Sequence, residues 1–145
     1  MYKKSILLFL FLILLIAGCS KLTIKNLEFA SMENNTLVSH SNNYSVGDTV
    51  YLVLEDIGSF EKDNKSMIKV DIDMSVVDFN STVLLNKSNM LGDSGYLNVT
   101  GNKLEFPYVN VNTETLVKGK YTIFVKVKDL IGNKSAARSA TFSLQ

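Results

Sequence analysis

The side chain best placed for covalent chemistry is Cys19, the only cysteine among the 145 residues. A basic pair at residues 3–4 precedes an uninterrupted apolar run over residues 6–16, and the small residues Ala17 and Gly18 then lead to the cysteine. This order of basic, apolar and small residues is typical of a signal peptide, because the small residues leave room for a peptidase. The sequence therefore predicts an exported chain that is cut just before Cys19.

The stretch Leu15-Ile16-Ala17-Gly18-Cys19 resembles the lipobox of prokaryotic lipoproteins. In that family the cysteine thiol is alkylated with diacylglycerol, and the chain is cut so that the cysteine becomes the lipidated N-terminus. The resemblance implies that residues 1–18 are a lipoprotein signal peptide containing a signal helix. It also implies that Cys19 is the lipidation site and that the lipobox consists of Ile16, Ala17 and Gly18.

An uncut signal anchor is the alternative interpretation of the apolar run. A helix that spans a bilayer needs about 20 apolar residues, whereas the run at residues 6–16 has only 11. Two acyl chains give stable attachment without a spanning helix. We therefore expect a lipid-anchored protein on the extracytoplasmic face of the membrane, at the cell surface or in a periplasm.

The mature chain, residues 19–145, is nearly neutral and of single-domain size. Without residues 1–18 it has 13 basic and 14 acidic side chains, and nucleic acid requires clustered positive charge that this chain lacks. Its length suits one domain after a short tether at residues 19–21. With Cys19 lipidated, no cysteine is left for a disulfide, so packing and hydrogen bonds must stabilise the domain.

The elements that carry these residues are predicted to be strands. Apolar and polar residues alternate with period two, which indicates half-buried strands, over residues 49–55, 67–77, 120–128 and 138–144. Weaker patterns cover residues 22–29, 82–86, 96–99 and 104–111. Turn-rich segments separate them, so we expect an all-β antiparallel sandwich of seven or eight strands. The phase change within residues 22–29 indicates a first strand that bends or bulges between two sheets, and Pro107 indicates an edge strand or a bulge.

A second resemblance lies in the last 30 residues. Leu116-Val117-Lys118-Gly119-Lys120-Tyr121 resembles the tyrosine corner of immunoglobulin-like sandwiches, in which a tyrosine hydroxyl bonds back to the preceding corner. Residues 119–135 resemble the closing hairpin of bacterial and archaeal immunoglobulin-like or fibronectin-like surface domains. The resemblance implies that fold, with Leu116, Gly119 and Tyr121 as structural corner residues. The chain differs from antibody-type domains, because Ile123 stands where they have a cysteine and there is no tryptophan.

Asp71 and Asp73 lie on one face of their predicted strand and could bind a cation or serve in acid-base chemistry. In an immunoglobulin-like sandwich this strand lies beside the one that carries Lys120, Lys126 and Lys128. Calcium requires six to eight oxygen ligands, and the sequence has no loop of that kind. Cross-strand ion pairs are therefore favoured over a metal site, and no metal or cofactor is expected.

His40 is the only histidine, and it lies in a polar stretch. A general base needs a positioned partner, and the chain has no Gly-x-Ser-x-Gly elbow that would supply one. An exposed loop histidine is therefore favoured over a catalytic one, and the protein is expected not to be an enzyme.

Phe124 falls on the solvent face of a strand whose opposite face is already apolar, so it is the leading candidate for a partner contact. Ile131 at the next turn, Lys126 and Lys128 could extend that contact. The alternative is that a loop covers Phe124, or that it is one of the single exposed apolar residues common on any surface.

Seven Asn-x-Ser/Thr sequons could accept N-linked glycans, as in a glycosylated archaeal surface protein. An asparagine-rich composition with many serines is the alternative explanation. The asparagines are Asn34, Asn43, Asn64, Asn80, Asn86, Asn98 and Asn133.

Together these patterns predict a membrane-anchored, non-catalytic binding or scaffolding module of the cell envelope, with a protein or glycan partner. An accessory subunit of a surface enzyme or transporter and a structural envelope component are the alternatives.

Replacement of Cys19 tests the anchor. In a Cys19→Ala variant the thiol that receives the lipid is missing, so the protein should leave the membrane fraction. Intact-mass spectrometry of the wild type should find diacylglycerol on Cys19. A wild-type mass that retains residues 1–18 and lacks diacylglycerol would instead indicate an uncut signal anchor.

Overall fold

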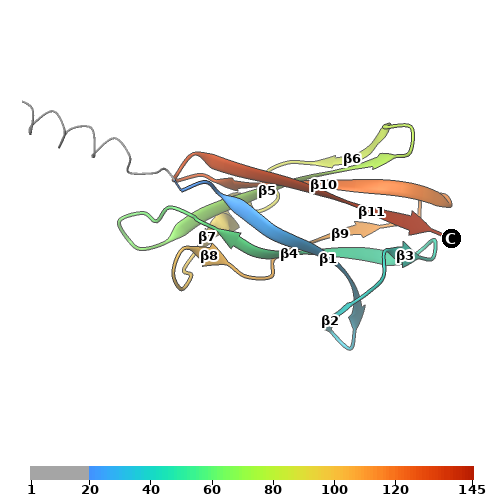
Figure 1. Ribbon diagram of the computed structural model, residues 1–145, viewed down its shortest axis with the longest axis horizontal. Helices are drawn as coiled ribbons and strands as arrows, with labels where there is room; N and C mark the ends of the chain where they lie inside the picture. The colour runs from blue at the N-terminus through green and yellow to red at the C-terminus, as the bar shows by residue number, and fades with distance from the viewer. Residues whose placement is uncertain (1–19) are drawn as a thin grey trace, which may run out of the picture.

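The computed structural model describes residues 20–145, which form two β-sheets packed face to face (Figure 1). The expected all-β sandwich is confirmed, whereas the predicted signal peptide, signal helix and lipidated Cys19 lie outside the described residues. Within residues 20–145 no helix is long and apolar enough to span a bilayer. The elements are β1 (Thr23–Glu33), β2 (Thr36–Ser39), β3 (Asn43–Tyr44), β4 (Thr49–Gly58), β5 (Ile68–Asp78), β6 (Val83–Lys87), the 3-10 turn η1 (Gly92–Gly95), β7 (Tyr96–Leu97), β8 (Lys103–Leu104), β9 (Tyr108–Asn112), β10 (Gly119–Asp129) and β11 (Lys134–Leu144).

The first sheet has the order β2-β1-β4, with β8 and β9 both pairing with the other edge of β4. The second sheet has the order β3-β11-β10-β5-β6, with β7 pairing with the start of β5. Neighbours are antiparallel except for β3, which runs parallel to β11. Because β2 and β3 belong to different sheets, the chain crosses the sandwich between them.

The long strands lie roughly along the sandwich, which gives it two distinct ends (Figure 1). The N-terminal end is defined here as residues 20–22, 59–67, 98–102 and 130–133. The C-terminal end is defined as residues 40–48, 79–82 and 113–118. β10 runs from the C-terminal end at Gly119 to the N-terminal end at Asp129.

The core lies between the two sheets and is supplied by alternate residues of the long strands. β10 shows the rule most clearly, since Tyr121, Ile123, Val125 and Val127 are buried while Phe124 and Lys126 between them are exposed. The same alternation in β5 and β4 completes a single apolar cluster that also includes Phe142 of β11. Period-two patterning therefore identified the main core strands correctly.

In both β1 and β4 the core-facing residues change from one alternating phase to the other, and the two changes lie opposite each other. Leu54 and Ile57 of β4 are both buried although they differ in phase, and Asp56 between them has a φ of 49°. Opposite it, Lys25 of β1 contacts the Asp56 carboxylate at 2.9 Å. The expectation that the first strand bends or bulges between two sheets is wrong, because β1 pairs with β4 in one continuous register on both sides of this point. The phase change in β1 is instead matched by one in its partner.

Several short elements differ from the sequence expectation. β1 extends to Glu33 and forms a hairpin with β2 through Asn34 and Asn35, whose φ values of 48° and 62° suit a tight hairpin turn. The strand predicted over residues 104–111 is split into β8 and β9 by Pro107. Eleven strands therefore replace the expected seven or eight, since two-residue strands are too short to show a period.

Pro107 lies where β9 joins the edge of its sheet, which is one of the two places expected for it. Its carbonyl accepts a hydrogen bond from the amide of Leu54 at 2.8 Å. Because proline has no N–H, its carbonyl is the only backbone group through which Pro107 can pair with β4.

The turn before β10 is closed by Tyr121. Its buried ring stacks on Phe142 with 5.5 Å between the ring centroids, and its hydroxyl donates a 2.6 Å hydrogen bond to the carbonyl of Val117. Gly119, with a φ of 155°, lies between the two partners, and Leu116 packs against the core. These contacts attach the 113–118 segment to the body of the sandwich.

Candidate functional site

The exposed face of the β11-β10-β5-β6 sheet carries a shallow groove of about 290 Å³ centred on Phe124. Phe124 lies opposite Ser75 of β5 and Ser139 of β11 in the strand register. Because these neighbours are small, the ring is left 46% exposed. The groove is lined further by Asp73, Asn86, Lys126, Ala137 and Arg138. The sequence prediction of a solvent-facing Phe124 agrees with this placement.

Polar groups surround the ring on several strands. Asn86 comes from the edge strand β6, Lys126 from β10 and Arg138 from β11. The Arg138 guanidinium also donates a hydrogen bond of 2.5 Å to the carbonyl of Lys25 in the other sheet, which holds this side chain at the sheet margin. An apolar ring can pack against the apolar face of a sugar or against an apolar side chain. The hydrogen-bonding groups around the ring can then bind polar groups of the same partner.

Next to the groove, Lys128 joins the two carboxylates that the sequence singled out. Its Nζ lies 2.8 Å from Asp73 Oδ1 and 3.3 Å from Asp71 Oδ2. The expected cross-strand ion pairing is therefore present, and Asp71 is buried within it, since it is only 3% exposed. Lys128 is engaged in these ion pairs and does not line the groove around Phe124. Its role in a partner contact stays a prediction.

The loop after β6 explains why Asp71 is buried. The amide of Leu91 donates to Asp71 Oδ1 at 3.1 Å, and the amide of Asn89 donates to Asp73 Oδ1 at 3.0 Å. The loop thus covers the start of β5 and satisfies both carboxylates with backbone donors. Residues 20–145 contain no group of three or more His, Cys, Asp or Glu side chains that could hold a metal ion.

The pKa values of this cluster follow from burial and hydrogen bonding. Burial opposes ionisation of Asp71 and Asp73, but amide donors and Lys128 outweigh it, so the pKa of each carboxyl lies below its usual value. Hydrogen bonding to Asp73 raises the pKa of Lys128, although burial acts in the opposite direction. All three groups are therefore charged at neutral pH.

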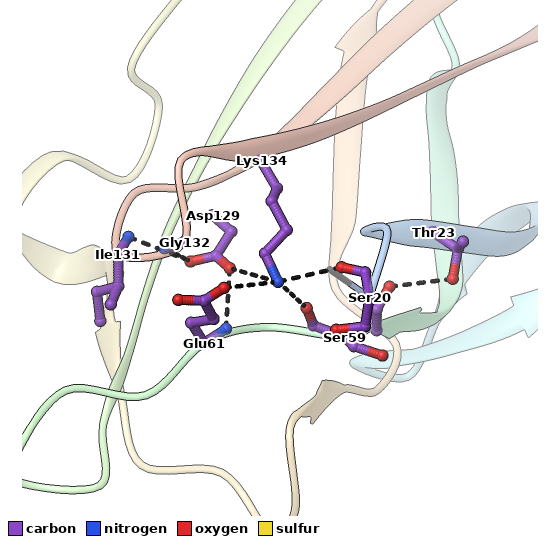
Figure 2. Close-up of polar contacts among 9 residues, drawn as sticks. Ser20, Thr23, Ser59, Glu61, Asp129, Ile131, Gly132 and Lys134 are labelled. Atoms are coloured by element: carbon purple, nitrogen blue, oxygen red, sulfur yellow. Dashed lines mark hydrogen bonds and ion pairs between the residues drawn. The ribbon is translucent and has the colours of Figure 1, made fainter. Parts of the chain in front are cut away.

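A second polar cluster closes the N-terminal end of the sandwich (Figure 2). Asp129 is buried and accepts hydrogen bonds from the amides of Glu61, Ile131 and Gly132 at 2.9, 3.1 and 3.0 Å. Lys134 Nζ lies 3.1 Å from Glu61 Oε1 and 4.0 Å from Asp129 Oδ2. The cluster joins the turn between β10 and β11 to the loop after β4.

Lys134 also contacts the first described residue. Its Nζ donates to the carbonyl of Ser20 at 3.1 Å and to that of Ser59 at 3.2 Å, and Figure 2 shows the three groups converging. This arrangement could not be predicted from the sequence, because its members are far apart in the chain. A buried aspartate at a strand end followed by a glycine turn, as in Asp129 and Gly132, is the local signal that could have pointed to it.

At the same turn, the exposed apolar residue is not the one predicted. Leu130 is 46% exposed, whereas Ile131 is half-buried and donates its amide to Asp129. Ile131 also lies at the end of the sheet, away from the groove that contains Phe124. Of the four residues predicted for a partner contact, Phe124 and Lys126 line the groove, whereas Ile131 and Lys128 do not.

His40 is exposed and lies against Tyr44. The two rings stack with centroids 4.6 Å apart, and His40 Nδ1 donates to the carbonyl of Ser41 at 2.7 Å. The Tyr44 hydroxyl donates to the carbonyl of Ala30 at 3.0 Å, and burial raises the pKa of Tyr44 to about 12. Both rings border a polar hollow of about 460 Å³ at the C-terminal end.

The asparagines of all seven sequons are exposed, so each is reachable from solvent. They occur at both ends of the sandwich, in the β1–β2 turn and on the edge strand β6, and do not gather on one face. The lipobox residues Ile16, Ala17 and Gly18 and the predicted lipidation site Cys19 lie outside the described residues.

Comparison with protein-family models finds no match, and comparison with curated proteins finds none either. Among solved structures, the chain is similar to the crystal structure of the PmoD soluble domain from Methylocystis sp.. The two share 10% sequence identity with a TM-score of 0.42, over 88% of this chain and 100% of that one. A likeness at this level says nothing about what this chain binds.

The lowered pKa values predict how the fold responds to acid. A carboxyl whose pKa is lower in the folded state stabilises the protein above its unfolded pKa of about 3.9 and loses that effect as the pH falls. Between about pH 5 and pH 2 the wild type should therefore lose about 1–2 kcal/mol more unfolding free energy than Asp73→Asn. Urea unfolding at several pH values measures this, with Asp93→Asn at an exposed position as the control. Equal slopes for wild type and Asp73→Asn would contradict it.

Proposed function

We propose that this protein is a membrane-anchored extracytoplasmic lipoprotein whose single immunoglobulin-like sandwich acts as a non-catalytic binding module of the cell envelope. The lipid on Cys19 holds it at the membrane, and the groove around Phe124 receives a protein or glycan partner.

Three features of the fold support the finer assignment to an immunoglobulin-like sandwich. β11, β10, β5 and β6 are neighbours in that order, as strands G, F, C and C′ of variable-type immunoglobulin domains are. The chain also changes sheets near its start, since β2 pairs with β1 whereas β3 runs parallel to β11 in the other sheet. The hydrogen bond from Tyr121 to Val117 has the geometry expected for a tyrosine corner.

The observation that carries the binding proposal is the exposed ring of Phe124 at the centre of a sheet face. Other exposed apolar residues lie at turns and edges, whereas Phe124 lies on a central strand with paired neighbours on both sides. Placing a large ring there without cover exposes apolar area, which a partner would remove from water. The small residues Ser75 and Ser139 leave room for that partner to reach the ring.

The seven exposed sequon asparagines support a role as glycan acceptors, if the organism glycosylates its surface proteins. Peptide mass spectrometry of the native protein identifies which of them are used.

A second candidate function is that of an accessory subunit, which the C-terminal end of the sandwich favours. Phe79 and Val117 are 78% and 74% exposed. With Leu84 and the half-buried Leu116, they border a hollow of about 180 Å³. Apolar groups gathered in this way are typical of protein contacts, and this end points away from the proposed anchor.

Substitution of Phe124 tests the binding proposal. Cross-linking in native membranes followed by mass spectrometry should recover a partner with the wild type and at least tenfold less of it with Phe124→Ser, since a central aromatic contact is worth about 2 kcal/mol. Phe106→Ser, at a 61% exposed phenylalanine that does not line the groove, is the matched control. Unchanged capture by a folded Phe124→Ser variant would refute the groove as the binding site.

The accessory-subunit candidate predicts the reverse result. If a protein subunit packs on the C-terminal end, Val117→Ser should reduce its recovery about fivefold to tenfold, because it removes a largely exposed apolar side chain from the contact. Phe124→Ser should then have no effect in the same cross-linking experiment. Circular dichroism checks that both variants keep the sheet content of the wild type.

A further inference from the structure

We propose that the N-terminal end of the sandwich is a second membrane contact, which seats against the headgroups of an anionic bilayer and sets the orientation of the domain. This inference rests on the proposed lipidation of Cys19, and it assigns a role to side chains that the anchor itself does not use.

The first step is that the chain is fixed to the domain almost at once. Lys134 Nζ holds the carbonyl of Ser20 at 3.1 Å, and Leu22 is 1% exposed within the core. Lys134 is in turn paired with Glu61 at 3.1 Å. The tether expected over residues 19–21 is therefore not a free linker, because its second residue, Ser20, is already bonded to the body of the sandwich.

The second step is the short distance between Cys19 and the body of the domain. Neighbouring Cα atoms are about 3.8 Å apart, so the Cα atom of Cys19 lies within about 4 Å of that of Ser20 and about 11 Å of that of Leu22. Acyl chains on Cys19 would enter the bilayer directly beside this end. The N-terminal end must then lie at the level of the headgroups, and the C-terminal end must lie away from the membrane, as the opposite ends in Figure 1 indicate.

The third step is the chemistry of the N-terminal end and its surroundings. Exposed lysines are present at Lys21, Lys62 and Lys65, and the adjoining segment adds one exposed charge of each sign at Lys103 and Glu105. Of the acidic groups here, Glu61 is paired with Lys134, and Asp63 Oδ1 accepts the amides of Lys65 and Met67 at 2.8 and 2.9 Å. Leu130 adds an exposed apolar side chain at the tip of the β10–β11 turn. Lysines around an apolar tip suit an anionic headgroup layer.

The opposite end has the reverse charge, which makes the orientation specific. Its loops and the adjoining strand ends carry the four acidic residues Glu33, Asp48, Asp78 and Glu114, against the two basic residues Lys118 and Lys120. An anionic surface would attract the lysine-bearing end and repel the acidic one. The charge distribution and the place of the anchor therefore favour the same orientation.

Three sequon asparagines, Asn64, Asn98 and Asn133, also lie at the N-terminal end. A glycan on any of them would hold the end off the headgroups. The inference therefore predicts that these three are unmodified in the membrane-bound protein.

The experiment uses single introduced cysteines in the full-length, processed protein. Because Cys19 is the only native cysteine and its thiol would be alkylated, Leu130→Cys and Val117→Cys each give one reactive thiol, at opposite ends of the sandwich. Each variant is labelled with an environment-sensitive fluorophore and reconstituted into vesicles of phosphatidylcholine and phosphatidylglycerol that contain a headgroup spin label. The label at residue 130 should be blue-shifted and quenched, and the label at residue 117 should not.

Charge reversal gives the matched control. Lys65→Glu with Lys103→Glu should lower the contact equilibrium of the label at residue 130 by about fivefold per lysine, which corresponds to about 1 kcal/mol each. Lys118→Glu with Lys120→Glu, which alters exposed lysines at the other end, should leave it unchanged.

The outcomes separate this inference from the proposed function. A protein without diacylglycerol on Cys19 that stays off the vesicles would overturn both. A lipidated protein whose labels at residues 130 and 117 are quenched equally, or one that carries a glycan on Asn133 in the membrane, would overturn the orientation alone. Selective quenching at residue 130 would support it.

Discussion

The double pairing of β10 is the constraint on which the rest of the structure depends. All eleven of its residues are in register with β11, and nine of them are also in register with β5. A strand with partners on both sides can satisfy its backbone donors and acceptors within the sheet, so its faces are rigidly defined. One face builds the core from Tyr121 to Val127, and the other must therefore present Phe124, Lys126 and Lys128 together.

Because no disulfide can form, burial between the sheets has to stabilise the domain. The aromatic residues Phe29, Tyr44, Tyr121 and Phe142 pack edge to face or stacked near the C-terminal end. Phe142 is fully buried among them and contacts the rings of the other three. The structure thus concentrates large rings where β3, β10 and β11 meet, and this packing secures the transition of the chain between the two sheets.

Charged groups are buried where they organise loops. Asp71 fixes the loop that follows β6, and Asp129 fixes the turn between β10 and β11 together with the loop after β4. Removing the hydrogen-bond donors of such a carboxylate would leave a buried charge without a partner, which is costly. The loops at the N-terminal end are therefore held in place by side chains, and this end can act as a defined surface in the proposed orientation.

Local patterning was enough to predict the class of the fold and its main strands. Alternation in β4, β5, β10 and β11 is a property of neighbouring residues, so the solvent-facing position of Phe124 could be foreseen. The ion pairing between the aspartates of β5 and the lysines of β10 was predicted from the resemblance to immunoglobulin-like sandwiches, which places the two strands side by side. Other features depend on the three-dimensional structure. These are the burial of Asp71 under residues 89–91, the exposure of Leu130 in place of Ile131, and the bond between Lys134 and Ser20. The bonds from Leu91 to Asp71 and from Lys134 to Ser20 join residues 20 and 114 positions apart, and a pattern of period two carries no information over such separations.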